Sequence, residues 1–207
     1  MRVLIAIPTF ENIYPDTYKA LWDMDKGGHE CLFEFVRGYD CATARNNIVK
    51  RALDIGADYV MMVDNDVTVP KDALVNLISH GVDVVSGYYA HRNKENDSTD
   101  KTNLCRLGEF NYTDQYTGAE LKEMRERGEY LFRIHGGGMG CILINTRVFM
   151  QIKYPWYDWV NYNDERHSML SEDLFFCEQC KFASIKIHAD SRVACGHLIR
   201  QILTLGI

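Results

Sequence analysis

The chain has 207 residues, of which 46% are hydrophobic and 25% charged, and its formal net charge is −6. This composition is that of an ordinary globular protein of one domain, and the acidic balance disfavours a broad nucleic-acid-binding face. No apolar run reaches the ~20 residues that span a bilayer, and the first residues lack the pattern of a signal peptide. Seven cysteines without regular spacing are typical of reduced thiols, so we expect a cytoplasmic protein.

The first ninety residues alternate between segments of strand and helix character. Apolar runs predict strands at residues 3–7, 31–36, 59–63 and 83–86. Amphipathic patterns between them predict helices at residues 18–24, 42–53 and 70–79. Strands that alternate with helices pair in parallel, because a parallel pair needs a crossover connection. We therefore expect an α/β domain with a mainly parallel sheet flanked by helices.

Two carboxylates follow the third predicted strand, in the segment Asp64-Asn65-Asp66. In an extended backbone Asp64 and Asp66 point the same way, and the cleft of an open α/β sheet lies at the carboxyl ends of its strands. Two acids in one place repel each other unless a cation relieves them, so the segment predicts a divalent metal site. Plain turn chemistry is the alternative, since Asp and Asn favour turns.

The second half of the chain begins with eleven residues, 93–103, that include no apolar side chain. We expect this stretch to be a flexible loop or lid. Beyond it we expect strands at residues 104–110, 130–134, 141–144 and 185–188 and helices at 117–128, 145–152 and from 171. Thr117 and Glu120 have the spacing of a capping box.

Glycine is concentrated at residues 136–140, which indicates unusual backbone angles or a close approach to a ligand. A tight bulge and a loop lining a sugar are both consistent with this segment. Residues 154–162 contain five aromatic side chains, which predict either a packed satellite core or a stacking platform.

Three other residues have both a plain and a functional interpretation. Arg45 is either a solvated helix charge or a contact to a diphosphate, for which a guanidinium is suited. Asp173, in Ser171-Glu172-Asp173, either complements the helix dipole or acts as a general base. His197 follows Gly196 and is either an ordinary histidine or a metal ligand.

Taken in order, these segments resemble the GT-A glycosyltransferases. The segments are Pro8-Thr9, Ala44-Arg45-Asn46, Asp64-Asn65-Asp66, residues 136–140, Ser171-Glu172-Asp173-Leu174 and Gly196-His197. The resemblance covers nearly the whole chain and is closest to the family-2-like group. In its histidine the pattern is similar to polypeptide GalNAc-transferases and mannosylglycerate synthase. The family usually has a glycine before its last strand, where this chain has Ser184, and we expect a tolerated turn variation.

The resemblance implies a single GT-A domain over residues 1–207, with a nucleotide-binding half at 1–92 and an acceptor and catalytic half at 104–207. It implies a nucleotide-sugar donor, most commonly a UDP-sugar. The residues implied to bind the donor are Pro8, Thr9, Asp40, Arg45, Asp64, Asn65, Arg92, Gly137 and Gly138. Those implied to bind Mn²⁺ or Mg²⁺ are Asp64, Asp66 and His197, and a histidine ligand favours manganese.

The implied chemistry is transfer of a glycosyl group to a hydroxyl acceptor, with Asp173 as the base and Glu172 orienting substrate or capping the helix. Inversion is the expected stereochemical outcome, although the relatives that share the histidine retain configuration. A nucleotidyltransferase and a degenerate glycan-binding module are the alternatives. The acceptor stays open between a small molecule, a glycan, a lipid head group and a modified base in nucleic acid, the last being disfavoured by the acidic charge.

Overall fold

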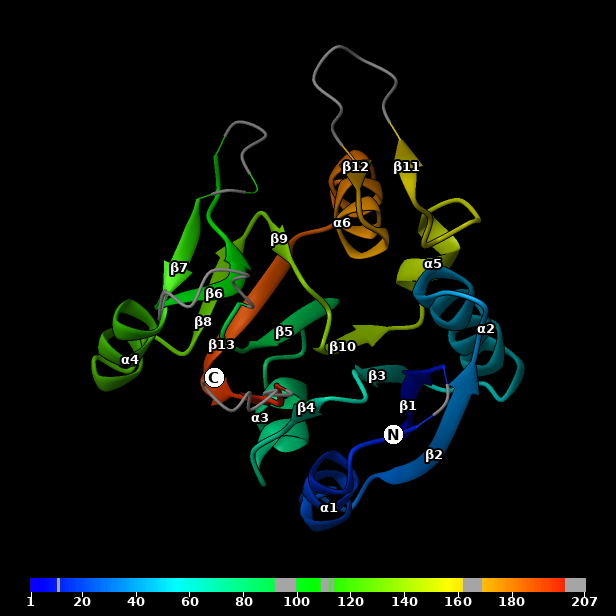
Figure 1. The fold of residues 1–207 in the computed structure, drawn as a ribbon, viewed down its shortest axis with the longest axis horizontal. Coiled ribbons are helices and arrows are strands. Elements are labelled where there is room, and N and C mark those ends of the chain that lie inside the picture. The colour runs from blue at the N-terminus through cyan, green and yellow to red at the C-terminus, as the bar shows by residue number, and fades with distance from the viewer. Residues whose placement is uncertain (11, 92–99, 109–111, 113, 162–168, 200–207) are drawn as a thin grey trace, which may run out of the picture.

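The structure, a computed structural model, describes residues 1–10, 12–91, 100–108, 112, 114–161 and 169–199 (Figure 1). A seven-stranded sheet with the order β2-β1-β3-β10-β5-β13-β8 forms its centre. The strands are β1 Arg2–Thr9, β2 Glu30–Arg37, β3 Tyr59–Val63, β5 Val84–Tyr88, β8 Leu131–Ile134, β10 Cys141–Asn145 and β13 Ile187–Ala194.

The predicted parallel sheet is present with one rearrangement. Strands β2, β1, β3, β5 and β13 run in one direction, whereas β10 and β8 run in the other. β10 lies between β3 and β5, although its residues follow them by more than fifty positions in the chain. Local sequence patterns predict strands but not their order in space, so this insertion was not foreseen.

Helices cover both faces of the sheet, as expected. Figure 1 shows α1 (Pro15–Asp23) and α3 (Ala73–Ser79) on one face. α2 (Cys41–Asp54), α5 (Val148–Gln151) and α6 (Glu172–Phe182) lie on the other. Successive strand residues alternate between the two cores: Leu4 packs toward α2, whereas Ile5 packs toward α1 and α3. Burial on both faces explains why the strands read as continuous apolar runs.

Three small sheets complete the fold. β6 (Lys101–Cys105) lies between β7 (Gln115–Thr117) and β9 (Gly136–Gly137). β4 (Val67–Thr68) pairs with β14 (Gly196–His197), and β11 (Val160–Asn161) pairs with β12 (Met169–Leu170). The remaining helix, α4 (Gly118–Glu126), begins with the predicted capping box of Thr117 and Glu120.

The polar stretch at 93–103 is not a loop along its whole length. Residues 92–99 lie outside the described part of the chain, but Lys101, Thr102 and Asn103 belong to β6. Thr102 and Asn103 are buried, and their side chains donate hydrogen bonds to the carbonyls of Tyr116 and Gly138. Buried polar side chains are tolerated when they are hydrogen-bonded, which is why composition misled the prediction here.

Several smaller predictions are refined by the structure. α5 begins at Val148 and not at Asn145, whose side chain instead accepts a hydrogen bond from the backbone of Arg147. β13 continues past residue 188 to Ala194. Ser184, at the position where a glycine was expected, has a φ of 59°. No helix among the described residues is both long and apolar enough to cross a membrane.

The aromatic segment divides between the two predicted roles. Trp156 and Tyr157 are buried, and Tyr157 stacks on Phe176 of α6 with ring centroids 5.0 Å apart. Tyr154 and Trp159 are exposed. The buried pair therefore extends the core on the α6 side, and Tyr162, the fifth aromatic residue, lies outside the described part of the chain.

Candidate active site

A cavity of about 380 Å³ opens near the carboxyl ends of β3 and β5 and the start of α6, and we call it the Asp66 cavity. It is lined by Asp64, Asp66, Tyr89, His91, Asn103, Cys105, Tyr112, Gln115, Gly137, Gly138, Ser171, Asp173, Leu174 and His197. The structure thus brings together predicted residues from both halves of the chain. This is where the cleft of an open α/β sheet is expected.

Asp66 and His197 approach each other through the pairing of β4 with β14. Val67 is in register with His197, and the backbone N–H of Leu198 donates to the carbonyl of Asp66. The His197 Nε2 atom lies 3.9 Å from Oδ1 of Asp66. His197 Nδ1 is 2.9 Å from the carbonyl oxygen of Ala90, which can only accept, so Nδ1 carries the hydrogen. Nε2 is then the nitrogen on the side of Asp66 and the cavity.

The Asp64-Asn65-Asp66 segment is a turn and not the extended backbone that we expected. The N–H of Val67 donates to the carbonyl of Asp64, and the N–H of Asp64 donates to the carbonyl of Gly140. Turn chemistry therefore governs the backbone of this segment, as the alternative interpretation held. Both carboxylates nevertheless line the same cavity.

Arg45 lies beneath the cavity. Its side chain is only 2% exposed, so it is not a solvated helix charge. Its Nη2 lies 2.8 Å from Oδ1 of Asp64, and its Nε lies 3.5 Å from Oε1 of Glu172. Burial alone would lower the Arg45 pKa, but the neighbouring carboxylates of Asp64 and Glu172 raise it, and the net result is a raised pKa. Arg45 is therefore a permanent buried cation that joins the end of β3 to the start of α6.

Glu172 and Asp173 have different surroundings although they are adjacent. Glu172 is 6% exposed and faces Arg45, whereas Asp173 lines the Asp66 cavity. Oδ1 of Asp173 accepts hydrogen bonds from the Ser171 hydroxyl and from the N–H of Leu174. Burial, with a further contribution from the charge of Glu172, raises the Asp173 pKa above its ordinary value. A carboxylate with a raised pKa is a better proton acceptor near neutral pH.

Close packing explains the glycines of the cavity wall. A Cβ atom on Gly137 would lie 2.3 Å from the carbonyl oxygen of Asn103 on β6, the strand with which β9 pairs. A Cβ atom on Gly138 would lie 2.5 Å from the hydroxyl of Tyr89 and 3.5 Å from Oδ2 of Asp173. The predicted close approach is therefore confirmed, and Gly137 and Gly138 line the cavity, whereas none of the glycines at residues 136–140 has a positive φ and β9 pairs with β6 without a bulge.

Sequence reasoning did not find two residues that hold this wall in place. Asn103 accepts a hydrogen bond from the N–H of Tyr89 and donates one to the carbonyl of Gly138. The Tyr89 hydroxyl accepts a hydrogen bond from the N–H of Gly140, and its ring meets that of His197 edge-on at 5.0 Å. Asn103 was hidden in a polar stretch, and Tyr89 in a run of aromatic residues after a strand, so neither had a distinguishing signal.

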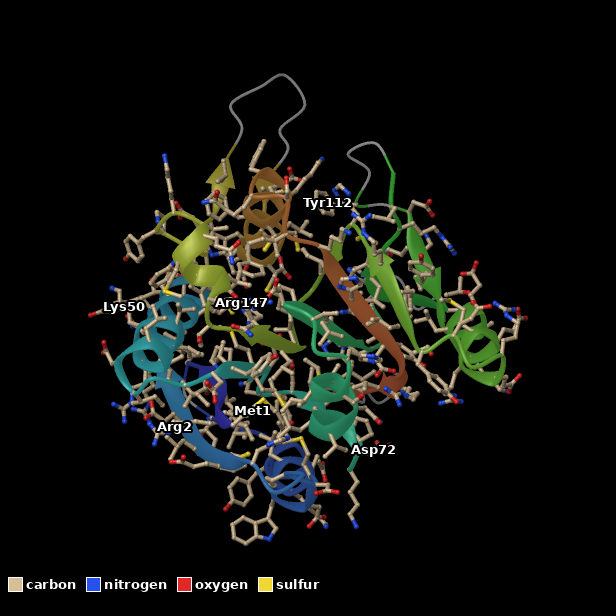
Figure 2. The ribbon with its side chains drawn as sticks, turned by 180° about the vertical axis from the view of Figure 1, so that it is seen from behind. Met1, Arg2, Lys50, Asp72, Tyr112 and Arg147 are labelled. Carbon is tan, nitrogen blue, oxygen red and sulfur yellow. The ribbon has the colours of Figure 1, made fainter. Side chains whose placement is uncertain are left out.

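The far wall of the cavity is tied to α6. Figure 2 shows Tyr112 between the small sheet and α6, where its hydroxyl donates to Glu178. The Tyr112 ring also meets that of His135 edge-on at 4.9 Å.

A second cavity, of about 350 Å³, adjoins the turn, and we call it the Pro8 cavity. It is lined by Pro8, Thr9, Phe10, Gly38, Tyr39, Asp40, Cys41, Ala44 and Asn65. Asp40 caps α2, since its Oδ1 accepts a hydrogen bond from the N–H of Thr43 at 2.8 Å. Asn65 belongs to the Pro8 cavity, while Asp64 and Asp66 on either side of it belong to the Asp66 cavity. The two cavities therefore meet at this turn.

The predicted catalytic, donor and metal residues are thus distributed over three places. Pro8, Thr9, Asp40 and Asn65 line one cavity, and Asp64, Asp66, Gly137, Gly138, Asp173 and His197 line the other. Arg45 and Glu172 line neither, and Arg92 lies outside the described residues. Within the described part of the chain, no three His, Cys, Asp or Glu side chains converge closely enough to form a metal site without other ligands.

Comparisons with known proteins identify the fold. No family profile and no curated protein sequence matches the chain. Among solved structures, A197 from STIV has a TM-score of 0.65 and 20% identity, over 97% of this chain and 87% of that one. GalNAc-T7 with UDP, GalNAc and Mn²⁺ has a TM-score of 0.63 and 10% identity, over 96% of this chain and 44% of that one. This chain thus spans less than half the length of GalNAc-T7. At these identities the likeness confirms the predicted GT-A type α/β fold and nothing finer.

Proposed function

We propose that this protein is a metal-dependent glycosyltransferase that transfers a sugar from a nucleoside diphosphate donor to a hydroxyl acceptor. The observation that carries the proposal is the meeting of Asp66, His197 and Asp173 in one cavity that adjoins a second, separate cavity. The fold supports glycosyl transfer in general, since one structure of the same fold is that of GalNAc-T7. The site of the nucleotide, the metal and the general base are proposed from the individual residues of the two cavities.

The Pro8 cavity is the proposed site of the nucleobase. It has a volume of about 350 Å³. Pro8 and Tyr39 provide flat apolar surface, and Asp40 provides a polar edge. A sugar diphosphate that extends from this cavity past Asn65 would reach the Asp66 cavity. UDP is the proposed nucleotide, because GalNAc-T7 was solved with UDP.

The donor set at Asp66 and His197 fits a divalent cation, with Asp64 as a further candidate ligand. The hydrogen bond from His197 Nδ1 to Ala90 holds the ring with Nε2 toward Asp66, which is the state that a ligating imidazole requires. Two protein ligands are enough where substrate phosphates and water complete the coordination sphere, as is common for Mg²⁺. We favour Mn²⁺ because one ligand is an imidazole. When bound, the cation stabilises the negative charge that develops on the departing diphosphate.

Asp173 is the proposed general base. It faces the same cavity as Asp66, and Ser171 and the N–H of Leu174 fix the carboxylate through Oδ1. We assign to it the proton of the acceptor hydroxyl, in a displacement that inverts configuration at the sugar. Transfer with retention is the alternative within the same fold. In this proposal, residues 1–92 hold the nucleotide, and residues 104–207 supply the base and the acceptor side.

Arg45 and Glu172 are proposed as positioning residues and not as contacts to substrate. Arg45 is buried and already binds Asp64, so it would orient that carboxylate and neutralise part of the acidic cavity from below. Glu172 holds the other side of Arg45 and thereby links α6, which carries Asp173, to the end of β3.

The direct test is donor turnover. We would incubate the protein with a panel of nucleotide sugars in Mn²⁺ and in chelator, and measure release of the nucleoside diphosphate and of pyrophosphate separately. We expect nucleoside diphosphate release that requires the metal and that falls by ~100-fold or more in Asp66→Ala. Asp54→Ala, which removes an exposed acid at the end of α2, is the matched control and should keep full activity.

Three results would contradict the proposal. Full turnover of Asp66→Ala in chelator would show that the reaction requires no metal. Release of pyrophosphate in place of nucleoside diphosphate would identify a nucleotidyltransferase. Binding of a glycan without any metal-linked nucleotide binding would identify a degenerate recognition module.

A further inference from the structure

Strand β2 forms one edge of the central sheet. It is eight residues long and pairs only with β1, and the described part of the chain places no strand on its outer side. A free strand edge presents a row of backbone N–H and C=O groups to solvent, and natural proteins usually shorten, charge or cover such an edge.

The opposite edge of the same sheet is protected in that way. β8 has four residues, Leu131–Ile134, and carries the exposed Arg133 near its middle. β2 is twice as long, and three of its central side chains are apolar and exposed: Leu32 at 37%, Phe33 at 43% and Phe35 at 49%. Of the two edges, β2 is therefore the one suited to accept another strand.

Aromatic side chains of α1 extend this surface. Tyr18 is 49% and Trp22 72% exposed, and their rings stack with centroids 6.3 Å apart. With Phe33 and Phe35 they line a groove of about 400 Å³ to which Leu21 and Lys26 also contribute. We call Tyr18, Trp22, Phe33 and Phe35 the α1–β2 patch. None of the four lines the Asp66 or the Pro8 cavity, so donor binding does not explain their exposure.

We propose that the α1–β2 patch and the free edge of β2 form the interface of a homodimer, in which two copies of β2 pair antiparallel about a two-fold axis. A strand edge is satisfied most completely by another strand, and a two-fold axis perpendicular to the sheet makes the pair antiparallel. The same axis keeps α1 of both copies on one face of the joined sheet. The two patches then form a single continuous apolar layer.

The residues of β2 are compatible with this self-pairing. When Glu34 lies on the axis, Phe33 lies opposite Phe35 of the partner subunit, and Leu32 lies opposite Val36 of the partner subunit. Aromatic and aliphatic cross-strand pairs stabilise an antiparallel sheet. The two Glu34 carboxylates would face each other, but each already binds Arg51 of its own α2, with Nε 2.6 Å from Oε1. Their charges are therefore balanced within each copy.

The exposed area of the patch and the strand edge approaches that of a specific dimer interface. With ~200 Å² for each aromatic side chain and roughly half of it exposed, the patch supplies about 400 Å² per copy and about 800 Å² for two. The strand backbones, with Leu32 and Arg37, bring the total toward the ~1,200–2,000 Å² of a specific interface.

Sedimentation equilibrium or light scattering of the whole chain over a ~1,000-fold range of concentration tests the proposal. We expect a concentration-dependent mass that reaches twice 23.9 kDa and stops there. Phe35→Glu should weaken association by at least ~10-fold, because it places a charge in the apolar centre of the interface. Phe182→Glu is the matched control: Phe182 is 79% exposed at the end of α6, and its replacement should leave the dimer intact.

If Phe35→Glu does not fold, Trp22→Glu tests the same interface without a change in strand β2. It should also weaken association by at least ~10-fold. In the unaltered protein the total fluorescence of Trp22, Trp156 and Trp159 should shift to the blue as the dimer forms, because Trp22 becomes buried. A monomer at every concentration, assembly that continues past the dimer, or equal weakening by Phe182→Glu would each overturn the proposal.

Discussion

The Pro8 cavity and the Asp66 cavity lie next to each other but are assembled differently. The Pro8 cavity is built within residues 8–65, from the end of β1, the start of α2 and the Asn65 turn. The Asp66 cavity draws on residues from 64 to 197 and on strands that pair only after the chain has returned to β3 and β5. The first needs the pairing of β1 with β3, both in the first third of the chain, whereas the second also needs β10 and β13 from the second half to pair beside β3 and β5. From the roles that we propose for the two cavities, we expect substitutions in the Asp66 cavity to change turnover and metal binding, and substitutions in the Pro8 cavity to change donor affinity.

The largest effect is expected at Asp173. Asp173→Asn removes the proton acceptor but keeps the shape and the hydrogen bonds of the side chain, so kcat should fall by ~100-fold or more while donor affinity stays the same. Steady-state kinetics of transfer, with donor binding measured by calorimetry, checks both quantities. An unchanged kcat would assign the base to another residue.

The pH dependence of Asp173 can be predicted from its raised pKa. Turnover should decline as the pH falls through the raised pKa, which is above the ordinary value of 3.8. Between the two values the folded protein holds the proton more tightly than the unfolded chain, so ionisation of Asp173 opposes folding as the pH rises. Asp173→Asn should therefore be at least as stable as the unaltered protein at neutral pH in urea denaturation. A variant that is markedly less stable would show that the ionised carboxylate contributes to stability.

The next effect is expected at His197. His197→Ala should weaken Mn²⁺ binding in the presence of nucleoside diphosphate by ~10- to 100-fold, because one ligand is lost. Titration calorimetry measures the metal affinity directly. His29→Ala, which removes a half-buried histidine directly before β2, is the control and should bind the metal normally. Equal metal affinity in the two variants would exclude His197 as a ligand.

A smaller effect, on stability, is expected at Gly138. Gly138→Ala places a methyl group against the Tyr89 hydroxyl, and overpacking of this kind costs about 1–3 kcal/mol of unfolding free energy. Gly108→Ala is the matched control, since a Cβ atom there would have no neighbour within 4 Å. Urea denaturation of both variants measures the difference. Equal stabilities would mean that the Tyr89 side chain moves aside without cost.

The smallest effect is expected in the Pro8 cavity. Asp40→Ser keeps an oxygen that can cap α2 but removes the carboxylate, so it should weaken nucleotide binding by roughly 3- to 10-fold, the value of one hydrogen bond. The value of kcat at saturating donor should stay unchanged. A fall in kcat with no change in donor affinity would reverse the roles that we propose for the two cavities.

The amino-acid sequence was sufficient to predict the elements that depend on neighbours in the chain. Continuous apolar runs predicted β1 and β3, because strands buried on both faces have no polar side. The capping box at Thr117 and the glycine-like turn at Ser184 are also local, since each is formed by hydrogen bonds or backbone angles within a few residues. The same holds for the acidic turn, although its backbone conformation was predicted wrongly.

Only the tertiary structure decided which of these segments meet. It inserted β10 between β3 and β5, buried Arg45 between Asp64 and Glu172, and used Asn103 to tie Tyr89 to Gly138. Sheet order and the burial of polar side chains are set by contacts between residues far apart in the chain. The free energy of such contacts does not depend on neighbouring residues in the sequence, so no local pattern indicates them. The types of residue in the site could therefore be read in advance, whereas the proximity of Asp66 to His197 depends on the pairing of β4 with β14.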